Sequence, residues 1–390
     1  MAFDISRRFL LTGAAGASLA SVAACASTAA GTSTASVDAA FPPEKYGVDD
    51  PYLLGPPEGV ALLSRNENPY GPAPSALKMI DYAAKKGAFY TSRGATMMLM
   101  EMIAERHGVS PEQVVITTGS GEALSAIALI YGPKGPIVAP RLFWDTTALY
   151  AKRMDMANIE RVALTEEMDI DIVAIEAAVD GSKGLVQLCN PNNPTGKVMP
   201  ASVIKPAVRR MAAKATVLVD EAYMELADDP EGTTCVDLVK EGHDVIIART
   251  FSKIYGMAGV RVGYTISSAE TAEKIRNTTM SWSPSLSYAA AIGCYNDEAF
   301  LSMSKSKIVE GREMVTTTLD TLGLDYLPSQ TNFVYFKSGK PANDVQAAMM
   351  ERKISVRGQY MDYADWTRVS MGKLDDVERF CKALPEVLGA

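Results

Sequence analysis

The chain has 390 residues, of which 47% are hydrophobic and 22% charged, so it can bury a full core and divide into two domains. Its formal net charge of −8, without any run of lysine and arginine, argues against nucleic acid as a partner. Its two histidines, His107 and His243, lie far apart without ligand-spaced neighbours. We therefore expect neither a metal site nor a Ser-His-Asp triad, and acid–base chemistry has to come from lysine, tyrosine or carboxylates.

The N-terminus carries a candidate export signal. Twin arginines, Arg7 and Arg8, precede an apolar stretch over residues 9–24 that is rich in alanine and glycine. This pattern resembles a twin-arginine export signal, which we expect to occupy residues 1–26. The alternative, a first helix that stays with the protein, is disfavoured because no polar face recurs at helical spacing. We therefore expect a periplasmic or otherwise exported protein.

Two processing routes fit the end of this signal. Residues 22–25 match a lipobox, which would place a lipid on Cys25, whereas residues 24–26 match ordinary signal-peptidase cleavage. No other apolar run is long enough to span a membrane, so membrane attachment is expected only through export or this lipid. Residues 27–60, which begin with an Ala-, Ser- and Thr-rich stretch, are expected to form a flexible leader and N-terminal arm.

From residue 111 onward, short apolar runs alternate with helical patterns. Several runs are apolar on both faces, so the sequence predicts an α/β fold whose mostly parallel sheet is covered by helices. The predicted strands are residues 114–118, 136–139, 184–189, 215–219, 245–248 and 262–266. Ligands of such sheets bind at the carboxyl ends of the strands, so the residues after each run are the candidates for chemistry.

Glycine-rich and turn-rich segments follow two of these strands. Gly119, Ser120 and Gly121 lead into a helical pattern, where free backbone N–H groups make a site for an anion such as phosphate. A plain tight turn is the alternative for this segment taken alone. The second segment, residues 190–196, contains prolines that fix φ and asparagines that hydrogen-bond locally.

Charged and hydroxyl side chains follow two further strands. Asp220 ends a strand, where burying a carboxylate is costly unless a cation or donor meets it; a structural ion pair is the alternative. Lys253 follows the next run, close to Thr250, Ser252 and Arg261. Pyridoxal phosphate requires such a set: a lysine for its aldehyde, a carboxylate for its ring nitrogen, and backbone donors, hydroxyls and arginine for its phosphate.

Motifs that match a known family run from about residue 62 to residue 372. They are SRNENPYGP (64–72), GSGEA (119–123), NPNNPTG (190–196), VDEAY (219–223), TFSKIYGMAGVRVGY (250–264) and the pair Arg357 and Arg368. In this order they resemble the fold-type I pyridoxal phosphate aminotransferases of class I/II, most closely the histidinol-phosphate aminotransferase family. The resemblance implies a large cofactor-binding domain over residues 86–299 and a smaller α/β domain built from residues 61–85 plus 300–390.

The resemblance also implies a role for each candidate site residue. Three residues would hold the ring of a cofactor joined to Lys253 as an aldimine, with Asp220 on the ring nitrogen and Asn193 and Tyr223 on the ring hydroxyl. The phosphate ligands would be Ser120, Gly121, Thr250, Ser252, Arg261 and, from the partner subunit of a homodimer, the residue equivalent to Tyr90. The substrate carboxylate would bind Arg368, and the further candidates for substrate contact are Arg357, Asn68 and Tyr70.

One aromatic residue is expected to stack on the cofactor. The family pattern places it after Pro140, where this chain is slightly longer, so Phe143 and Trp144 are the candidates and Trp144 is favoured.

These roles imply transfer of an amino group from an amino acid, or an amino-alcohol phosphate, to a 2-oxo acid. Arg368 would fix the carboxylate plane and leave the Cα–H bond aligned with the ring, which favours transamination over decarboxylation. A pyridoxal phosphate lyase or decarboxylase of the same fold is the alternative among enzymes, and an exported binding protein without turnover is the alternative outside them. Because histidine biosynthesis belongs in the cytoplasm, the export signal favours a substrate other than histidinol phosphate.

Overall fold

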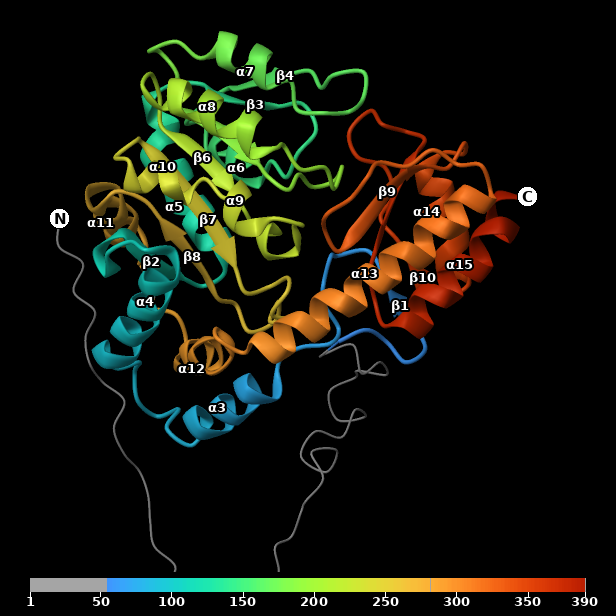
Figure 1. Cartoon of the computed structure of the whole chain (residues 1–390), viewed down its shortest axis with the longest axis horizontal. Coiled ribbons are helices and arrows are strands. Elements are labelled where there is room, and N and C mark those ends of the chain that lie inside the picture. Colours follow the sequence, from blue (N-terminus) through green and yellow to red (C-terminus); the bar gives the residue numbers. More distant parts are fainter. Residues whose placement is uncertain (1–54, 281, 390) are drawn as a thin grey trace, which may run out of the picture. The chain divides into compact units, whose positions relative to one another are not determined.

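The computed structural model describes residues 55–280 and 282–389 (Figure 1). The predicted export signal with Cys25, and the leader up to residue 54, lie outside these residues. In the part of the chain that is described, no helix combines the length and the apolar character needed to cross a membrane.

A seven-stranded sheet organises the larger part of the described chain, and its strands run in the order β2-β8-β7-β6-β5-β3-β4. The strands are β2 (Val114–Thr117), β3 (Ile137–Pro140), β4 (Ile159–Val162), β5 (Leu185–Cys189), β6 (Val217–Asp220), β7 (Val245–Thr250) and β8 (Gly263–Ile266). All neighbours from β4 to β7 pair in parallel, whereas β8 is antiparallel to both β7 and β2. This confirms the predicted α/β fold with a mostly parallel sheet.

The helices alternate with these strands and continue into the C-terminal part of the chain. The α-helices are α3 (Pro74–Ala84), α4 (Arg93–His107), α5 (Ser120–Tyr131), α6 (Thr146–Arg153), α7 (Ile172–Ala178), α8 (Ala201–Ala212), α9 (Pro230–Thr233), α10 (Val236–Lys240), α11 (Ala269–Thr278), α12 (Ser285–Cys294), α13 (Glu298–Thr321), α14 (Ala342–Glu351) and α15 (Leu374–Leu388). Three short 3₁₀ helices are η1 (Pro111–Gln113), η2 (Gly132–Lys134) and η3 (Met224–Leu226).

The central strands are buried on both faces. Every residue of β5, β6 and β7 is buried, and alternate residues enter two different hydrophobic clusters. Val219 and Ile247 pack in the cluster that includes residues of α8 and α10, whereas Leu218 and Ile246 pack in the one that includes residues of α5, α6 and α11. Successive side chains of a strand point to opposite faces, so helices cover this sheet on both sides.

Two small sheets lie in the C-terminal part of the chain. β9 (Phe333–Lys337) pairs antiparallel with β11 (Trp366–Ser370), and β1 (Ala61–Leu62) pairs in parallel with β10 (Ile354–Ser355). Figure 1 shows the long helix α13 running from α12 towards β9 and α14. The pairing of β1 with β10 brings the segment that follows β1 next to strands almost 300 residues later in the chain.

The division into a large and a small domain stays a prediction. The structure places the seven-stranded sheet inside residues 86–299 and the two small sheets outside that range. Helix α3, which the division assigns to the small domain, packs against α12, which it assigns to the large one. A side chain in place of Gly293 of α12 would meet the backbone carbonyl of Ser75 in α3, so these two helices lie in close contact.

Candidate active site

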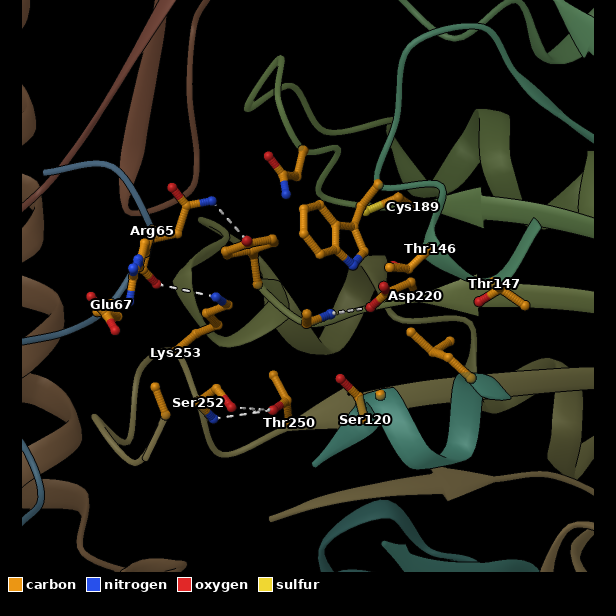
Figure 2. Close-up of a pocket in the computed structure, with 18 of the residues that line it drawn as sticks. Arg65, Glu67, Ser120, Thr146, Thr147, Cys189, Asp220, Thr250, Ser252 and Lys253 are labelled. Atoms are coloured by element: carbon orange, nitrogen blue, oxygen red, sulfur yellow. Dashed lines mark hydrogen bonds between the residues drawn. The ribbon is translucent and has the colours of Figure 1, made fainter. Parts of the chain in front are cut away.

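A cavity of about 630 Å³ opens at the carboxyl edge of the seven-stranded sheet (Figure 2). It is lined by the ends of β5, β6 and β7, the first residues of α5, parts of α6 and β11, and the segment after β1. Six basic side chains face two acidic ones, and these charged residues are Arg65, Arg153, Lys253, Arg261, Arg357, Arg368, Glu67 and Asp220. The cavity therefore favours anionic ligands.

The N-terminus of α5 forms one wall of the cavity. Its N-cap residue Gly119 has φ 72° and ψ 162°, a conformation that is open to glycine and strained for other residues, and it provides no side-chain cap. A Cβ at this position would also collide with the guanidinium of Arg261. Ser120 and Gly121, the first helical residues, line the cavity. The positive end of the helix is thus available to an anion.

Hydroxyls and a cation complete this wall. The hydroxyl of Thr250 donates to Ser252 Oγ at 2.9 Å, and the backbone N–H of Ser252 donates to Thr250 Oγ1 at 3.1 Å. Arg261 Nη1 donates to the carbonyl of Ala258 at 2.9 Å and reaches Ser252 Oγ at 3.4 Å. Backbone donors, two hydroxyls and a guanidinium thus meet in one place, which is the donor set of a phosphate site.

Asp220 ends β6 and is 3% exposed. Its carboxylate accepts a hydrogen bond from the backbone N–H of Ala222 at 3.1 Å, and no cation hydrogen-bonds to it among the described residues. Burial raises the pKa of Asp220 to about 6, against the opposing effects of the Ala222 N–H and the charge of Lys253. A buried carboxylate in this state fits a ligand that brings its own positive charge.

Lys253 follows β7 in a partly buried position. Its Nζ donates to the backbone carbonyl of Asn66 at 3.2 Å and lies 5.4 Å from the centre of the Tyr223 ring. Burial, together with the positive charge of Arg368, lowers the pKa of Lys253 to about 8. The neutral amine, which can act as a nucleophile or a base, is therefore far more populated near neutral pH than it would be for an ordinary lysine.

Arg368 of β11 is 3% exposed and belongs to the cavity wall. Its Nη1 donates to Asn193 Oδ1 at 2.5 Å, and its Nη2 donates to the carbonyl of Ser64 at 2.7 Å. Its Nε is buried without a hydrogen-bond partner among the described residues. The backbone of Arg357 pairs with that of Arg368, which brings the second predicted arginine to the cavity as well.

The structure separates the two candidates for a stacking ring. Trp144 lines the cavity and is 43% exposed, whereas Phe143 is buried in the hydrophobic cluster beneath α5 and α6. Of these two candidates, only Trp144 is therefore placed to contact a ligand in the cavity.

Three predicted residues do not line the cavity. The side-chain amide of Asn68 donates to the carbonyl of Ile254 at 2.7 Å and to Ser304 Oγ at 2.6 Å, so it supports the backbone next to Lys253 instead. Tyr70 lies outside the cavity wall. Tyr90 is 88% exposed and also lies away from the cavity of its own subunit.

Sequence reasoning missed several residues that the structure brings into the cavity. Asn66, Arg65 and Glu67 come from the SRNENPYGP motif, from which only Asn68 and Tyr70 had been selected. Arg153, in the last turn of α6, also lines the cavity. The motif marks this segment, but a run of consecutive polar residues does not tell which of its side chains reach the cavity.

These residues fit pyridoxal phosphate. Ser120, Gly121, Thr250, Ser252 and Arg261 would hold its phosphate, because they supply unused helix N–H groups, hydroxyls and a cation. A protonated ring nitrogen would give the buried Asp220 the cation that it lacks among the described residues. Lys253 supplies the amine that its aldehyde requires.

Comparisons with known proteins agree with this assignment. A family model of aminotransferases of class I and II matches residues 58–384. The histidinol-phosphate aminotransferase of Symbiobacterium thermophilum is 33% identical over 354 residues, which cover 87% of this chain and 96% of that protein. The enzyme of the same name from Halalkalibacterium halodurans is 30% identical over 337 residues, which cover 85% of this chain and 90% of that protein.

Solved structures give the same result. The histidinol-phosphate aminotransferase of Sinorhizobium meliloti, in complex with pyridoxal-5'-phosphate, aligns with a TM-score of 0.77 and 29% identity, covering 89% of this chain and 93% of that one. The L-threonine-O-3-phosphate decarboxylase of Porphyromonas gingivalis aligns with a TM-score of 0.72 at 20% identity and shares the fold. That likeness concerns the fold alone, whereas the family match extends over most of the sequence.

The predictions of family, cofactor and reaction class are therefore confirmed. Members of this family transfer amino groups between amino acids and keto acids and are typically dimeric. The chain belongs to the aminotransferases of class I and II and is a pyridoxal phosphate-dependent aminotransferase.

Proposed function

We propose that the substrate of this aminotransferase carries two anionic groups, one close to the reacting carbon and one at its far end. The observation that supports this proposal is a set of three arginines, Arg65, Arg153 and Arg357, that line the cavity and form no ion pair with a described carboxylate. Arg357 lies with its guanidinium 5.1 Å from the ring centre of Tyr360. Such cations favour a carboxylate or phosphate at the end of the substrate side chain.

Arg368 is proposed to bind the carboxylate next to the reacting carbon. It is held by Asn193 and Ser64 and keeps a buried Nε without a partner in the described chain. A planar guanidinium fixes the plane of a carboxylate through paired hydrogen bonds, and this fixes the direction of the neighbouring Cα–H bond. The same contact therefore favours proton removal from Cα over loss of the carboxylate.

Lys253 is proposed as the base that takes this proton at its Nζ. Its lowered pKa, to about 8, matches proton transfer near neutral pH. When bound, pyridoxal phosphate supplies an electron-accepting ring that stabilises the negative charge left at the substrate carbon. Asp220 is proposed to keep that ring electron-poor through its negative charge. Asn193 and Tyr223 are proposed to contact the ring hydroxyl.

The proposed substrate class predicts that amino donors with a charged side chain react faster than their neutral analogues. Glutamate and aspartate should be used with a kcat/KM at least about tenfold above glutamine and asparagine, because a charge-assisted contact is worth roughly 1.5 to 3 kcal/mol. Arg357→Gln should remove most of this preference and leave the rate with glutamine nearly unchanged. The measurement is the rate at which each donor alone converts the bound cofactor to its amine form, followed by visible absorbance, because glutamate with 2-oxoglutarate would only regenerate its own keto acid.

Two controls make this test specific. Arg210→Gln removes an exposed arginine that pairs with Glu176 away from the cavity, and it should leave the preference intact. Histidinol phosphate and histidinol form a separate pair that tests the anion close to the reacting carbon, because this phosphate is carried by the carbon next to the one that bears the amine. Equal rates for charged and neutral donors with the native enzyme would contradict the proposal.

The lowered pKa of Lys253 predicts how the protein without cofactor captures pyridoxal phosphate. The rate of capture, followed by visible absorbance, should rise with pH and level off above about 8, because only the neutral amine is a nucleophile. Borohydride reduction followed by mass spectrometry should find a pyridoxyl group on Lys253. The Lys253→Ala variant should show neither; an adduct on another lysine would refute the assignment.

Tyr90 is proposed to act in the neighbouring subunit of a homodimer. It is 88% exposed, and its ring contacts that of Trp282, 75% exposed, edge-on at 5.8 Å. Phe89 and Met280 are also exposed and line the same apolar groove. An exposed apolar patch of this kind is typical of an interface, and a second copy is the partner that a dimeric family offers.

Mixed dimers test this proposal. Tyr90→Ala and Lys253→Ala subunits should each be nearly inactive alone. After mixing in equal amounts, about a quarter of the native activity should return, because half of the dimers then contain one site with both native residues. If Tyr90 served its own subunit, every mixed dimer would lack one of the two residues in each site and no activity would return.

Export through the twin-arginine route is proposed from Arg7 and Arg8 alone. This route carries folded proteins, so the cofactor is bound before export. Cell fractionation should find the native protein outside the cytoplasm and an Arg7→Lys/Arg8→Lys variant inside it. A native protein that stays in the cytoplasm with residues 1–24 retained would refute export.

A further inference from the structure

Asn66 has a backbone conformation that is unusual for a buried residue. Its φ is 56°, in the left-handed region where asparagine is among the few tolerated residues besides glycine. It is 2% exposed and lines the cavity between Ser64 and Lys253. A residue held in this conformation needs strong local contacts, so its hydrogen bonds indicate what the conformation serves.

The backbone carbonyl of Asn66 turns towards the amine of Lys253. It accepts a hydrogen bond from Lys253 Nζ at 3.2 Å (Figure 2) and one from Asn332 Nδ2 at 2.9 Å. Asn332 is completely buried and fixes this carbonyl in place. The amine that takes part in the reaction therefore has a fixed acceptor that belongs to the backbone and not to the Asn66 side chain.

The side chain of Asn66 is oriented by Ser370. The hydroxyl of Ser370 accepts from the Asn66 backbone N–H at 2.9 Å and donates to Asn66 Oδ1 at 2.7 Å. Because the oxygen of the amide faces Ser370, its nitrogen has to face the other way, and Nδ2 donates to the hydroxyl oxygen of Tyr223 at 2.9 Å. The direction of the amide is therefore set by the network.

This contact determines how the Tyr223 hydroxyl can be used. Its oxygen already accepts from Asn66, and among the described residues no other side chain hydrogen-bonds to it. Its hydrogen remains available for an acceptor in the cavity, which Tyr223 lines. A tyrosine that accepts from an amide on one side is a donor on the other.

We infer that Asn66 is a positioning residue whose side chain makes Tyr223 a hydrogen-bond donor towards the cofactor ring, while its backbone independently holds Lys253. This inference rests on the roles proposed above for Tyr223 and Lys253. Asn66 acts through these two residues, so its side chain and its backbone have separable effects. Removal of the side chain alone affects the Tyr223 branch and leaves the Lys253 branch in place.

The test uses Asn66→Gly, because glycine adopts a φ of 56° without strain and keeps the backbone carbonyl. The readout is the pH titration of the visible absorbance of the holoenzyme. Loss of a donor to the ring oxygen raises the proton affinity of the bound chromophore, so the midpoint should move upward by roughly 0.5 to 1 pH unit. The pH dependence of cofactor capture by the apo-protein should stay the same, since the acceptor of Lys253 is retained.

A double variant decides whether the effect passes through Tyr223. Tyr223→Phe should move the midpoint in the same direction, and Asn66→Gly/Tyr223→Phe should move it no further than Tyr223→Phe alone. Asn190→Gly is the matched control, because Asn190 is a buried asparagine whose side chain hydrogen-bonds only the backbone of Met199 among the described residues, and it should leave the midpoint unchanged. Additive shifts, or no shift with Asn66→Gly, would overturn the inference.

Asn66→Asp provides a second route to the same answer if the glycine variant folds poorly. Aspartate keeps the shape of the side chain but offers Tyr223 an acceptor, which draws the phenol hydrogen away from the cavity and should again raise the midpoint. Failure of the wild-type protein to capture cofactor on Lys253 would instead contradict the proposed function. A wild type that responds to Tyr223→Phe but to neither Asn66 variant would contradict only the inference drawn here.

Discussion

A buried ion pair fixes the two strand ends on which the active site depends. Arg249 of β7 donates through Nη2 to Glu221, the residue after β6, at 2.8 Å, and both side chains are almost fully excluded from water. Each member directly neighbours a site residue, since Glu221 follows Asp220 and Arg249 precedes Thr250. Two buried charges are stable only when several hydrogen bonds hold them in a fixed geometry. The geometry of this pair therefore fixes the distance between Asp220 and the cavity wall that contains Thr250.

Burial also sets the electrostatics between these strand ends. It moves the pKa of Asp220 up to about 6 and that of Lys253 down to about 8, so both groups are displaced towards their neutral forms. Their pKa values consequently bracket neutral pH from either side. A ligand that places a positive charge next to Asp220 and a group that reacts with amines next to Lys253 is the one that these two side chains bind best. Burial of Asp220 and Lys253 costs stability, but the pKa shifts that it causes make both side chains suited to bind and react with such a ligand.

The sequence was sufficient to predict those site residues that directly follow a strand of the large sheet. The six predicted strands are present with small differences at their limits, and the residues after them meet in one cavity, because parallel strands place their carboxyl ends at one edge. The strand β4 escaped prediction because Glu160 and Arg161 interrupt its apolar pattern, as is tolerated in a strand at the edge of a sheet. Trp144 and Phe143 were separated only by tertiary packing.

The contribution of Asn66 had a different origin and was not accessible to the same reasoning. Its partner Ser370 of β11 lies 304 residues later in the chain, and β1, the strand that precedes Asn66, is only two residues long. A periodicity cannot be recognised in so short a strand. The SRNENPYGP motif contains Asn66, but nothing in its pattern distinguishes Asn66 from the predicted Asn68 and Tyr70. The role of a residue whose hydrogen-bond partners are distant in the sequence can be recognised only from the structure.

The segment around Asn66 also explains why the cavity cannot be assigned to one part of the fold. Tyr223 and Lys253 follow β6 and β7 of the seven-stranded sheet, whereas Ser370 belongs to β11 and Asn332 directly precedes β9. Asn66 hydrogen-bonds all four, so the position of the reacting amine depends on the packing of the small sheets against the large one. A displacement of either part would change the Lys253 and Tyr223 contacts together. Lys253 and Tyr223, which are proposed to act on the substrate and the cofactor ring, are therefore coupled through a single buried residue.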